Sequence, residues 1–220
     1  MADPKWKDVE PMVRAILRDE LDDDADTGRY PASLLIPWWN NAQIRLATHK
    51  PQRKHVIYLP DSWQSKPGVI VNVPSQFYNH VGLFRDGQNT AVPRISLYQA
   101  TFNAGVVGYY ITENELVLTG VNARSVGRLL FFYNAYYAPV VNEHSRVEVP
   151  FWATEACAIY TALQAVTREA MDDSRYRKYI SSEDAGNPTH NPFLGVARFL
   201  KERFYEIIQL HQDDDPEFDT

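Results

Sequence analysis

The chain has 220 residues, of which 45% are hydrophobic, 13% aromatic and 23% charged, a composition typical of a folded soluble protein with one large domain or two small ones. It contains no apolar run near the roughly 18–20 residues of a membrane-spanning helix, and residues 1–11 lack the apolar segment of a signal peptide. A single cysteine, Cys157, excludes an internal disulfide. We therefore expect no membrane association and synthesis in a reducing cytoplasm.

The net charge of −6 is distributed unevenly along the chain. Residues 19–26 contain six acidic side chains and residues 213–219 contain five, and neither segment contains Lys or Arg. The rest of the chain has 17 acidic against 22 basic side chains, a net charge of about +5. Two interpretations stay open: both segments are a solvated loop and a disordered tail, or they contact a complementary surface such as another copy of the chain.

The first predicted helix covers residues 8–21. Asp8 is a suitable N-cap, Pro11 is tolerated in the first turn, and Gly28 marks the loop that follows. The helical spacing is carried by Val9, Val13, Ile16, Leu17 and Leu21.

The most informative stretch is residues 29–46, RYPASLLIPWWNNAQIRL, which has one apolar helical face. Pro31 fits the first turn, whereas Pro37 predicts a kink or a late helix start. Trp38 and Trp39 point roughly 100° apart, so only one of them can face the core. We expect Trp38 to be the buried one, with Trp39 as the alternative, and the other to be available for a subunit contact.

Residues 55–149 change to a strand-like pattern of short Val-, Ile-, Tyr- and Phe-rich runs separated by Gly, Pro, Asn and Asp. The clearest hairpin has Glu113 and Asn114 in a tight turn. We predict an antiparallel sheet or small sandwich. Its strands are expected at 56–60, 68–73, 77–84, 94–98, 106–111, 115–120 and 126–137.

Helices return after Pro150. We predict helices at 151–172 and 174–182, and a last helix that starts at Pro192, with Asn191 as N-cap, and ends near Gln212. The expected fold class is therefore α+β, with a helical bundle built from both chain ends and an inserted antiparallel sheet or sandwich lobe. The expected domains are 1–54 with 150–212, the β insert 55–149, and an acidic tail 213–220.

The sequence contains no GxSxG, Walker-type, HExxH, CxxC or GxGxxG motif, and its six histidines are scattered. Asp22, Asp24 and Asp26 resemble the first ligands of a twelve-residue calcium-binding loop. Counted from Asp22, however, the twelfth position is Ser33 instead of the expected Glu. Cys157 is expected to be a buried structural thiol. The basic residues 49–55 are interpreted as an exposed loop or as a salt partner of the acidic loop. We expect no catalytic residue, metal or cofactor.

Two functional alternatives stay open on the β block. One is a carbohydrate-binding or tail-associated module that uses aromatic side chains, although alternate residues of 131–137 more often fill a core. Its candidate residues are Tyr109, Tyr110, Phe132, Tyr136 and Tyr137. The other is a hydrolase that uses unpatterned carboxylates, namely Asp61, Glu113 or Glu115.

Residues 22–47, DDDADTGRYPASLLIPWWNNAQIRLA, resemble the N-terminal motif of tailed-bacteriophage head-to-tail adaptor (connector) proteins, a polar loop followed by a helix of the form ELLxWLNxAQxxLA. The matching positions are Leu34, Leu35, Trp38, Asn40 or Asn41, Ala42, Gln43 and Leu46. The order of a hairpin (108–120), a YYAP strand (136–139), a long helix from 151 and a closing helix from 191 is also similar to this family. Ile36-Pro37 and the length of the β block depart from the plainest helical adaptors.

The resemblance implies a non-enzymatic ring, usually a dodecamer, that docks beneath the portal protein, extends the DNA channel and binds the next neck or tail protein. DNA would pass without sequence-specific binding, and the protein would lie in the virion neck after assembly in the host cytoplasm. A ring needs two different contact faces on each subunit. Our candidate subunit or portal contacts are Trp38, Trp39, Asp22, Asp23, Asp24, Arg53, Lys54, Asp213, Asp214, Asp215 and Phe218.

Overall fold

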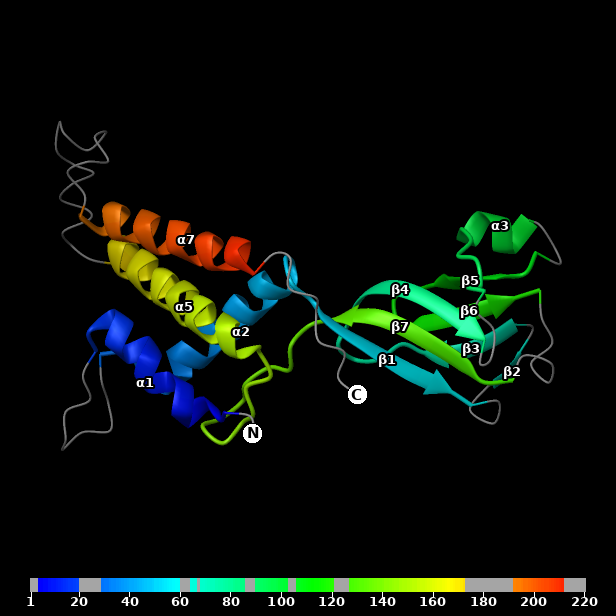
Figure 1. Ribbon diagram of the computed structural model, residues 1–220, viewed down its shortest axis with the longest axis horizontal. Helices are drawn as coiled ribbons and strands as arrows, with labels where there is room; N and C mark the ends of the chain where they lie inside the picture. The colour runs from blue at the N-terminus through cyan, green and yellow to red at the C-terminus, as the bar shows by residue number, and fades with distance from the viewer. Residues whose placement is uncertain are drawn as a thin grey trace. The chain divides into compact units, whose positions relative to one another are not determined.

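The computed structural model describes residues 4–19, 29–59, 64–66, 68–85, 90–102, 106–120, 127–172 and 192–211. It contains both helices and antiparallel sheets, so the α+β class is confirmed (Figure 1). The chain divides into two compact units, one with the described residues up to Lys50 and from Tyr137 onward, the other with Pro51–Tyr136. The predicted insert boundaries at 55 and 149 therefore differ from the structure, because a strand already begins at Gln52 and residues 137–149 return to the helical unit.

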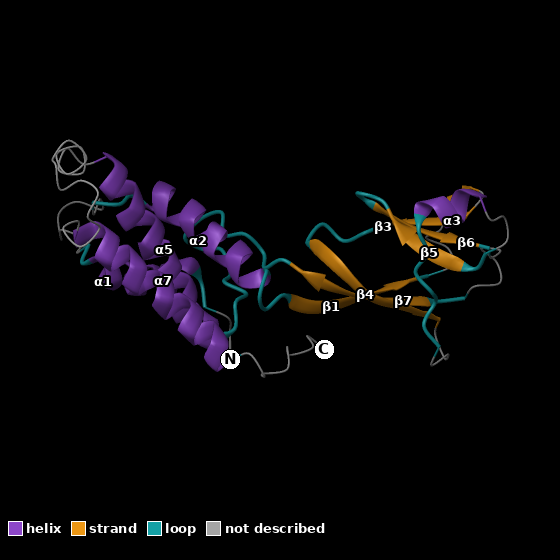
Figure 2. Ribbon diagram, turned by 90° about the horizontal axis from the view of Figure 1, so that it is seen from above, coloured by secondary structure: helices purple, strands orange, loops and turns teal. Residues whose placement is uncertain are grey.

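The helical unit contains α1 (Trp6–Leu17), α2 (Ala32–Ala47), α5 (Phe151–Asp172) and α7 (Pro192–Leu210). The central element is α5, which packs against each of the other three helices (Figure 2). Its bounds match the predicted ones, and α7 begins at the predicted Pro192 but ends at Leu210. Small side chains let the neighbouring helices approach α5 closely, since its buried positions include Ala153, Ala156, Cys157, Ala158, Ala162 and Ala165.

The predicted bounds of α1 are wrong at both ends. The helix begins at Trp6, after an N-cap at Lys5 whose backbone N–H donates to the Asp8 carboxylate at 2.9 Å. Asp8 therefore lies inside the first turn, where a negative charge is favourable. The helix ends at Leu17 because Arg18 adopts a left-handed conformation with φ 53°.

Asp19 is a buried acidic residue that joins the end of α1 to the start of α2. Its carboxylate accepts hydrogen bonds from Arg14 Nη1 at 2.6 Å, from Arg29 N at 2.6 Å and from Tyr30 N at 3.3 Å. Arg14 also binds Glu10. A buried charge is tolerated only when it is paired and hydrogen-bonded, so this network ties the C-terminal turn of α1 to the backbone that leads into α2.

The prediction that Trp38 is the buried tryptophan of α2 is wrong. Trp39 is fully buried and packs edge-on against Trp6, with ring centroids 5.3 Å apart, whereas Trp38 is half-buried. The helix is continuous from Ala32 through Pro37, so a late start is also wrong, and Pro31 is its N-cap instead of a first-turn residue. The alternative choice, Trp39, is therefore confirmed as the inward residue.

The β unit has two antiparallel sheets, of strand order β1-β7-β4 and β2-β3-β6-β5. The predicted hairpin is confirmed, since β5 pairs with β6 across Glu113 and Asn114. The predicted strand 94–98 is wrong, because a short helix, α3 (Leu97–Phe102), occupies that region. The strands are β1 (Gln52–Tyr58), β2 (Gln64–Lys66), β3 (Gly68–Asn72), β4 (Phe77–Arg85), β5 (Gly108–Ile111), β6 (Glu115–Thr119) and β7 (Leu129–Ala135).

Alternate side chains of β7 fill the core of this unit, as predicted for residues 131–137. Phe131, Tyr133 and Ala135 are buried, and Phe131 stacks on Tyr133 with centroids 5.6 Å apart. The same hydrophobic cluster includes Val71, Leu116 and Leu118 from the second sheet. The two sheets of the β unit therefore share one core, whose described members all lie between Pro51 and Tyr136.

Several predicted features lie outside the described residues, namely the helix 174–182, the N-cap Asn191 and the tail 213–220. Within the part of the chain that the structure describes, no helix is long and apolar enough to cross a bilayer.

Candidate functional site

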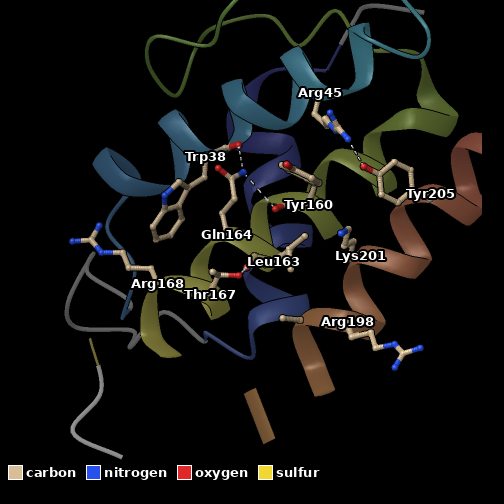
Figure 3. A pocket seen from close by; sticks show the side chains of 11 residues that line it. Trp38, Arg45, Tyr160, Leu163, Gln164, Thr167, Arg168, Arg198, Lys201 and Tyr205 are labelled. Atoms are coloured by element: carbon tan, nitrogen blue, oxygen red, sulfur yellow. Dashed lines mark hydrogen bonds between the residues drawn. The ribbon is translucent and has the colours of Figure 1, made fainter. Parts of the chain in front are cut away.

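A groove on the helical unit lies between α2, α5 and α7 and has a cavity volume of about 1010 Å³ (Figure 3). We call it the basic groove, because among the described residues that line it four side chains are cations and none is a carboxylate. It is lined by Trp38, Arg45, Tyr160, Leu163, Gln164, Thr167, Arg168, Ala197, Arg198, Lys201 and Tyr205.

The four cations of the basic groove are Arg45 on α2, Arg168 on α5, and Arg198 and Lys201 on α7. All four are exposed. Arg198 pairs with Glu202 at 2.8 Å, but both side chains of this ion pair are more than half exposed, so water screens the attraction. Positive side chains gathered in a concave surface raise the local concentration of anions.

Gln164 fixes the floor of the groove where α5 meets α2. Its Nε2 donates to the Trp38 carbonyl at 2.8 Å, and its Oε1 accepts from Asn41 Nδ2 at 3.2 Å. Both bonds join the same pair of helices, as Figure 3 shows for the bond to Trp38. The Trp38 ring is therefore held at the groove wall, where the Arg168 guanidinium lies 5.9 Å from the ring centroid in a cation–π contact.

Arg45 and Tyr205 close one end of the groove. Arg45 Nη2 donates to the Tyr205 hydroxyl at 2.5 Å, and this hydrogen bond raises the pKa of the guanidinium. The neighbouring His49 ring packs edge-on against Tyr205, and burial together with the Arg45 charge lowers the pKa of His49. His49 therefore adds no positive charge beside the groove at neutral pH.

The groove has the chemistry of a binding surface. Its lining offers cations, hydrogen-bond donors and aromatic faces, which suit an anionic ligand that also carries an apolar or aromatic group. Among the residues that the structure describes, no group of three or more His, Cys, Asp or Glu side chains could hold a metal ion. Cys157 is fully buried, as predicted, and burial raises the pKa of its thiol.

The structure separates the predicted contact residues. Trp38 lines the groove and Trp39 lies in the core. Arg53 and Lys54 lie on β1 of the other unit, where Lys54 Nζ binds Gln76 Oε1 at 3.0 Å. The prediction of an exposed loop at 49–55 is wrong, because β1 begins at Gln52. The remaining candidates lie outside the described residues: Asp22, Asp23, Asp24, Asp213, Asp214, Asp215 and Phe218.

The structure divides the candidate residues of the two alternatives on the β block. Tyr110, Phe132 and Tyr136 are half-buried. Tyr109 and Tyr137 are buried, and the Tyr137 hydroxyl donates to the Lys50 carbonyl at 2.8 Å, so neither ring can stack on a sugar. Glu113 and Glu115 are exposed instead of lying in a deep cleft, and Asp61 lies outside the described residues.

The sequence prediction missed most of the groove. Arg198, Lys201 and Tyr205 recur three and four residues apart on α7, and Tyr160, Gln164 and Arg168 recur every four residues on α5. This spacing places each set on one helical face. The spacing alone could not reveal that the two faces meet, because they are separated by some forty residues in the chain.

Comparison with known proteins gives no further guide, since no protein-family model and no curated protein matches the chain.

Proposed function

We propose that the protein is a non-enzymatic head-to-tail adaptor of a tailed bacteriophage. Copies of the chain would form a ring, a dodecamer by the family resemblance, beneath the portal protein. The ring would extend the DNA channel and bind the next neck or tail protein. The proposal rests on the resemblance of residues 22–47, of which Leu35, Ala42, Gln43 and Leu46 form the buried face of α2.

We also propose the finer architecture, a helical bundle from both chain ends with a sandwich lobe inserted in it. Support comes from the helices before and after the β unit, since α5 packs against α1 and α2 as well as against α7. In this arrangement the bundle would carry the contacts between subunits and the lobe would project a second surface.

The observation that best supports a role in assembly is the set of large apolar side chains exposed on the helical unit. Phe151 is 97% exposed, Leu210 is 72% exposed and Phe199 is 64% exposed. Large apolar side chains that are exposed to water are stabilised when another subunit covers them. A ring requires two unlike contact faces on each subunit, and exposed positions on both α5 and α7 can serve that purpose.

The test is association with portal rings of the phage that encodes the chain. Purified chain is mixed with portal rings, and the particles are imaged by electron microscopy after removal of unbound protein. A second ring of density on the portal is the expected result. Failure of the chain to associate with portal at any concentration would exclude the adaptor function.

A matched pair of α7 variants makes this test specific. Phe199→Glu places a charge at an exposed apolar position, so it is expected to abolish ring formation on the portal and to leave the fold intact. Gln209→Glu adds the same charge at an exposed polar position of the same helix, and rings should still form. Equal ring formation by both variants would show that Phe199 is not at a subunit contact.

A further inference from the structure

We propose that two copies of the chain associate through α7, with the two α7 helices antiparallel and related by a two-fold axis. The contact surface is a row of four side chains that we call the α7 stripe: Phe199, Arg203, Glu206 and Leu210. The inference goes beyond the proposed function and does not rest on it, because it concerns the chain in the absence of portal protein.

The four residues of the α7 stripe lie on one face of the helix. Their spacings of four, three and four residues are those of successive core positions in a coiled coil. Phe199 is 64% exposed and Leu210 is 72% exposed, so both ends of the stripe offer apolar surface to water. A different face of α7 is buried in the helical unit. The buried side chains of that face are Leu200, Phe204, Ile207 and Ile208.

The middle of the α7 stripe is an exposed ion pair. Arg203 Nη1 lies 2.9 Å from a carboxylate oxygen of Glu206, and the two side chains are 39% and 59% exposed. Water screens the attraction within such an exposed pair. Each side chain can therefore exchange its partner for the oppositely charged side chain of another copy.

The α7 stripe is complementary to itself in one antiparallel register. A two-fold axis that crosses the helix between positions 204 and 205 brings position 199 opposite position 210 of the other copy and position 203 opposite position 206. Phe199 then packs on Leu210 at each end, and Arg203 pairs with Glu206 in the middle. Because a two-fold contact repeats every pairing, the interface contains two apolar contacts and two ion pairs.

Other arrangements of the same stripe are less favourable. A parallel pair places Arg203 opposite Arg203 and Glu206 opposite Glu206, and like charges across an interface repel. An antiparallel pair shifted by seven residues places an apolar side chain opposite a charged one, either Phe199 opposite Arg203 or Leu210 opposite Glu206. The unshifted antiparallel register therefore satisfies both the apolar and the charged positions.

Phe151 of α5 extends the apolar surface beside the stripe. Its side chain is 97% exposed, and it precedes Glu155 by four residues, so the two lie on the same face of α5. This face borders the stripe, because Glu155 lies 3.7 Å from Arg203. The two helices run antiparallel, since Trp152 stacks on His211. The Phe151 ring is therefore near the C-terminal end of α7, where the other copy would cover it.

The two-fold contact differs from the contact of the proposed ring. A two-fold contact joins two copies and then stops, whereas the contact around a ring repeats in one direction. The pair is therefore a form of the free chain. Because Phe199 is also our candidate for the ring contact, the pair would have to separate before its chains enter a ring.

The first test measures the association of the full-length chain alone by sedimentation equilibrium over a range of concentrations. Wild type should show a monomer–dimer equilibrium. Arg203→Glu and Glu206→Arg each place like charges opposite one another in the pair, so each should weaken dimerisation by about tenfold or more. A wild-type chain that is monomeric at every concentration, or variants that dimerise as tightly as wild type, would overturn the proposal.

A mixture of Arg203→Glu with Glu206→Arg makes the test specific to the register. In a mixed pair the two acidic positions of one copy face the two basic positions of the other. The mixture should therefore dimerise like wild type although neither variant does so alone, and a folding defect cannot produce this rescue. A mixture that stays monomeric contradicts the proposed register.

Glu202→Arg is the matched control for Glu206→Arg, because it makes the same change at an exposed acidic residue of α7 outside the stripe. It should dimerise like wild type. If Glu202→Arg and Glu206→Arg lose dimerisation equally, net charge and not the stripe governs association, and the proposal is wrong.

Cysteine cross-linking tests the direction of the helices. Full-length Phe199→Cys and Leu210→Cys are oxidised separately and as a mixture, and the native Cys157 is buried. The proposed register brings positions 199 and 210 together, whereas two copies of position 199 lie about 16 Å apart along the axis, at 1.5 Å per residue. Disulfide-linked dimers should form mainly in the mixture, and equal cross-linking in the separate samples would overturn the proposal. Because no portal is present, dimerisation without portal association would exclude the adaptor function alone.

Discussion

The two adjacent tryptophans of α2 have different structural roles. Trp39 is fully buried against Trp6, whereas the ring of Trp38 lies at the wall of the basic groove. Trp39→Ala should lower the free energy of unfolding of the helical unit by about 3–5 kcal/mol, the usual cost of truncating a buried aromatic residue. Chemical denaturation followed by helical circular dichroism measures this loss. Trp38→Ala is the matched control, and a loss as large as that of Trp39→Ala would contradict the assignment.

His80 makes the stability of the β unit depend on pH. Burial and the charge of Arg94, whose Nη1 lies 3.2 Å from the ring nitrogens, lower the pKa of His80 below its ordinary 6.5. The unfolded chain therefore takes up a proton at a higher pH than the folded chain, so this contribution to stability is complete above pH 6.5 and is lost as the pH falls below it. The urea midpoint of wild type should decrease between pH 7.5 and 5.5, and His80→Gln should decrease less. An identical decrease in both proteins would contradict this role.

Asn40 joins α2 to the segment that leads into α5. Its Nδ2 donates to the Val140 carbonyl and its Oδ1 accepts from the Val140 N–H, both at 2.8 Å. Asn40→Ala leaves both backbone groups of a buried residue without this partner, so we expect a loss of about 2–3 kcal/mol in unfolding free energy. Asn41→Ala removes one exposed bond to Gln164, at 3.2 Å, and should cost less than about 1 kcal/mol. Equal losses, measured by urea denaturation, would show that Asn40 has no special role.

The two compact units have separate cores, which predicts separate local stabilities. Phe131→Ala should destabilise the β unit by about 3–5 kcal/mol and should speed amide hydrogen exchange in β1, β4 and β7 while α5 is unchanged. Trp39→Ala should give the reciprocal pattern. Hydrogen exchange with mass spectrometry distinguishes the two. Equal acceleration in both units after either substitution would mean that the chain unfolds as one cooperative unit.

The sequence by itself determined the α+β class, the α5 bounds, the β5–β6 hairpin and the alternation along β7, because each depends on local periodicity or turn chemistry. It failed at 94–98, where the Ile-Ser-Leu-Tyr run has strand-like composition but Leu97 begins a helix. Tertiary structure alone decided which tryptophan is inward, since Trp38 and Trp39 are equally apolar and the choice depends on Trp6 of α1. Tertiary structure also forms the basic groove. Arg45, Arg168, Arg198 and Lys201 come together only when three helices that are separate in the chain pack side by side.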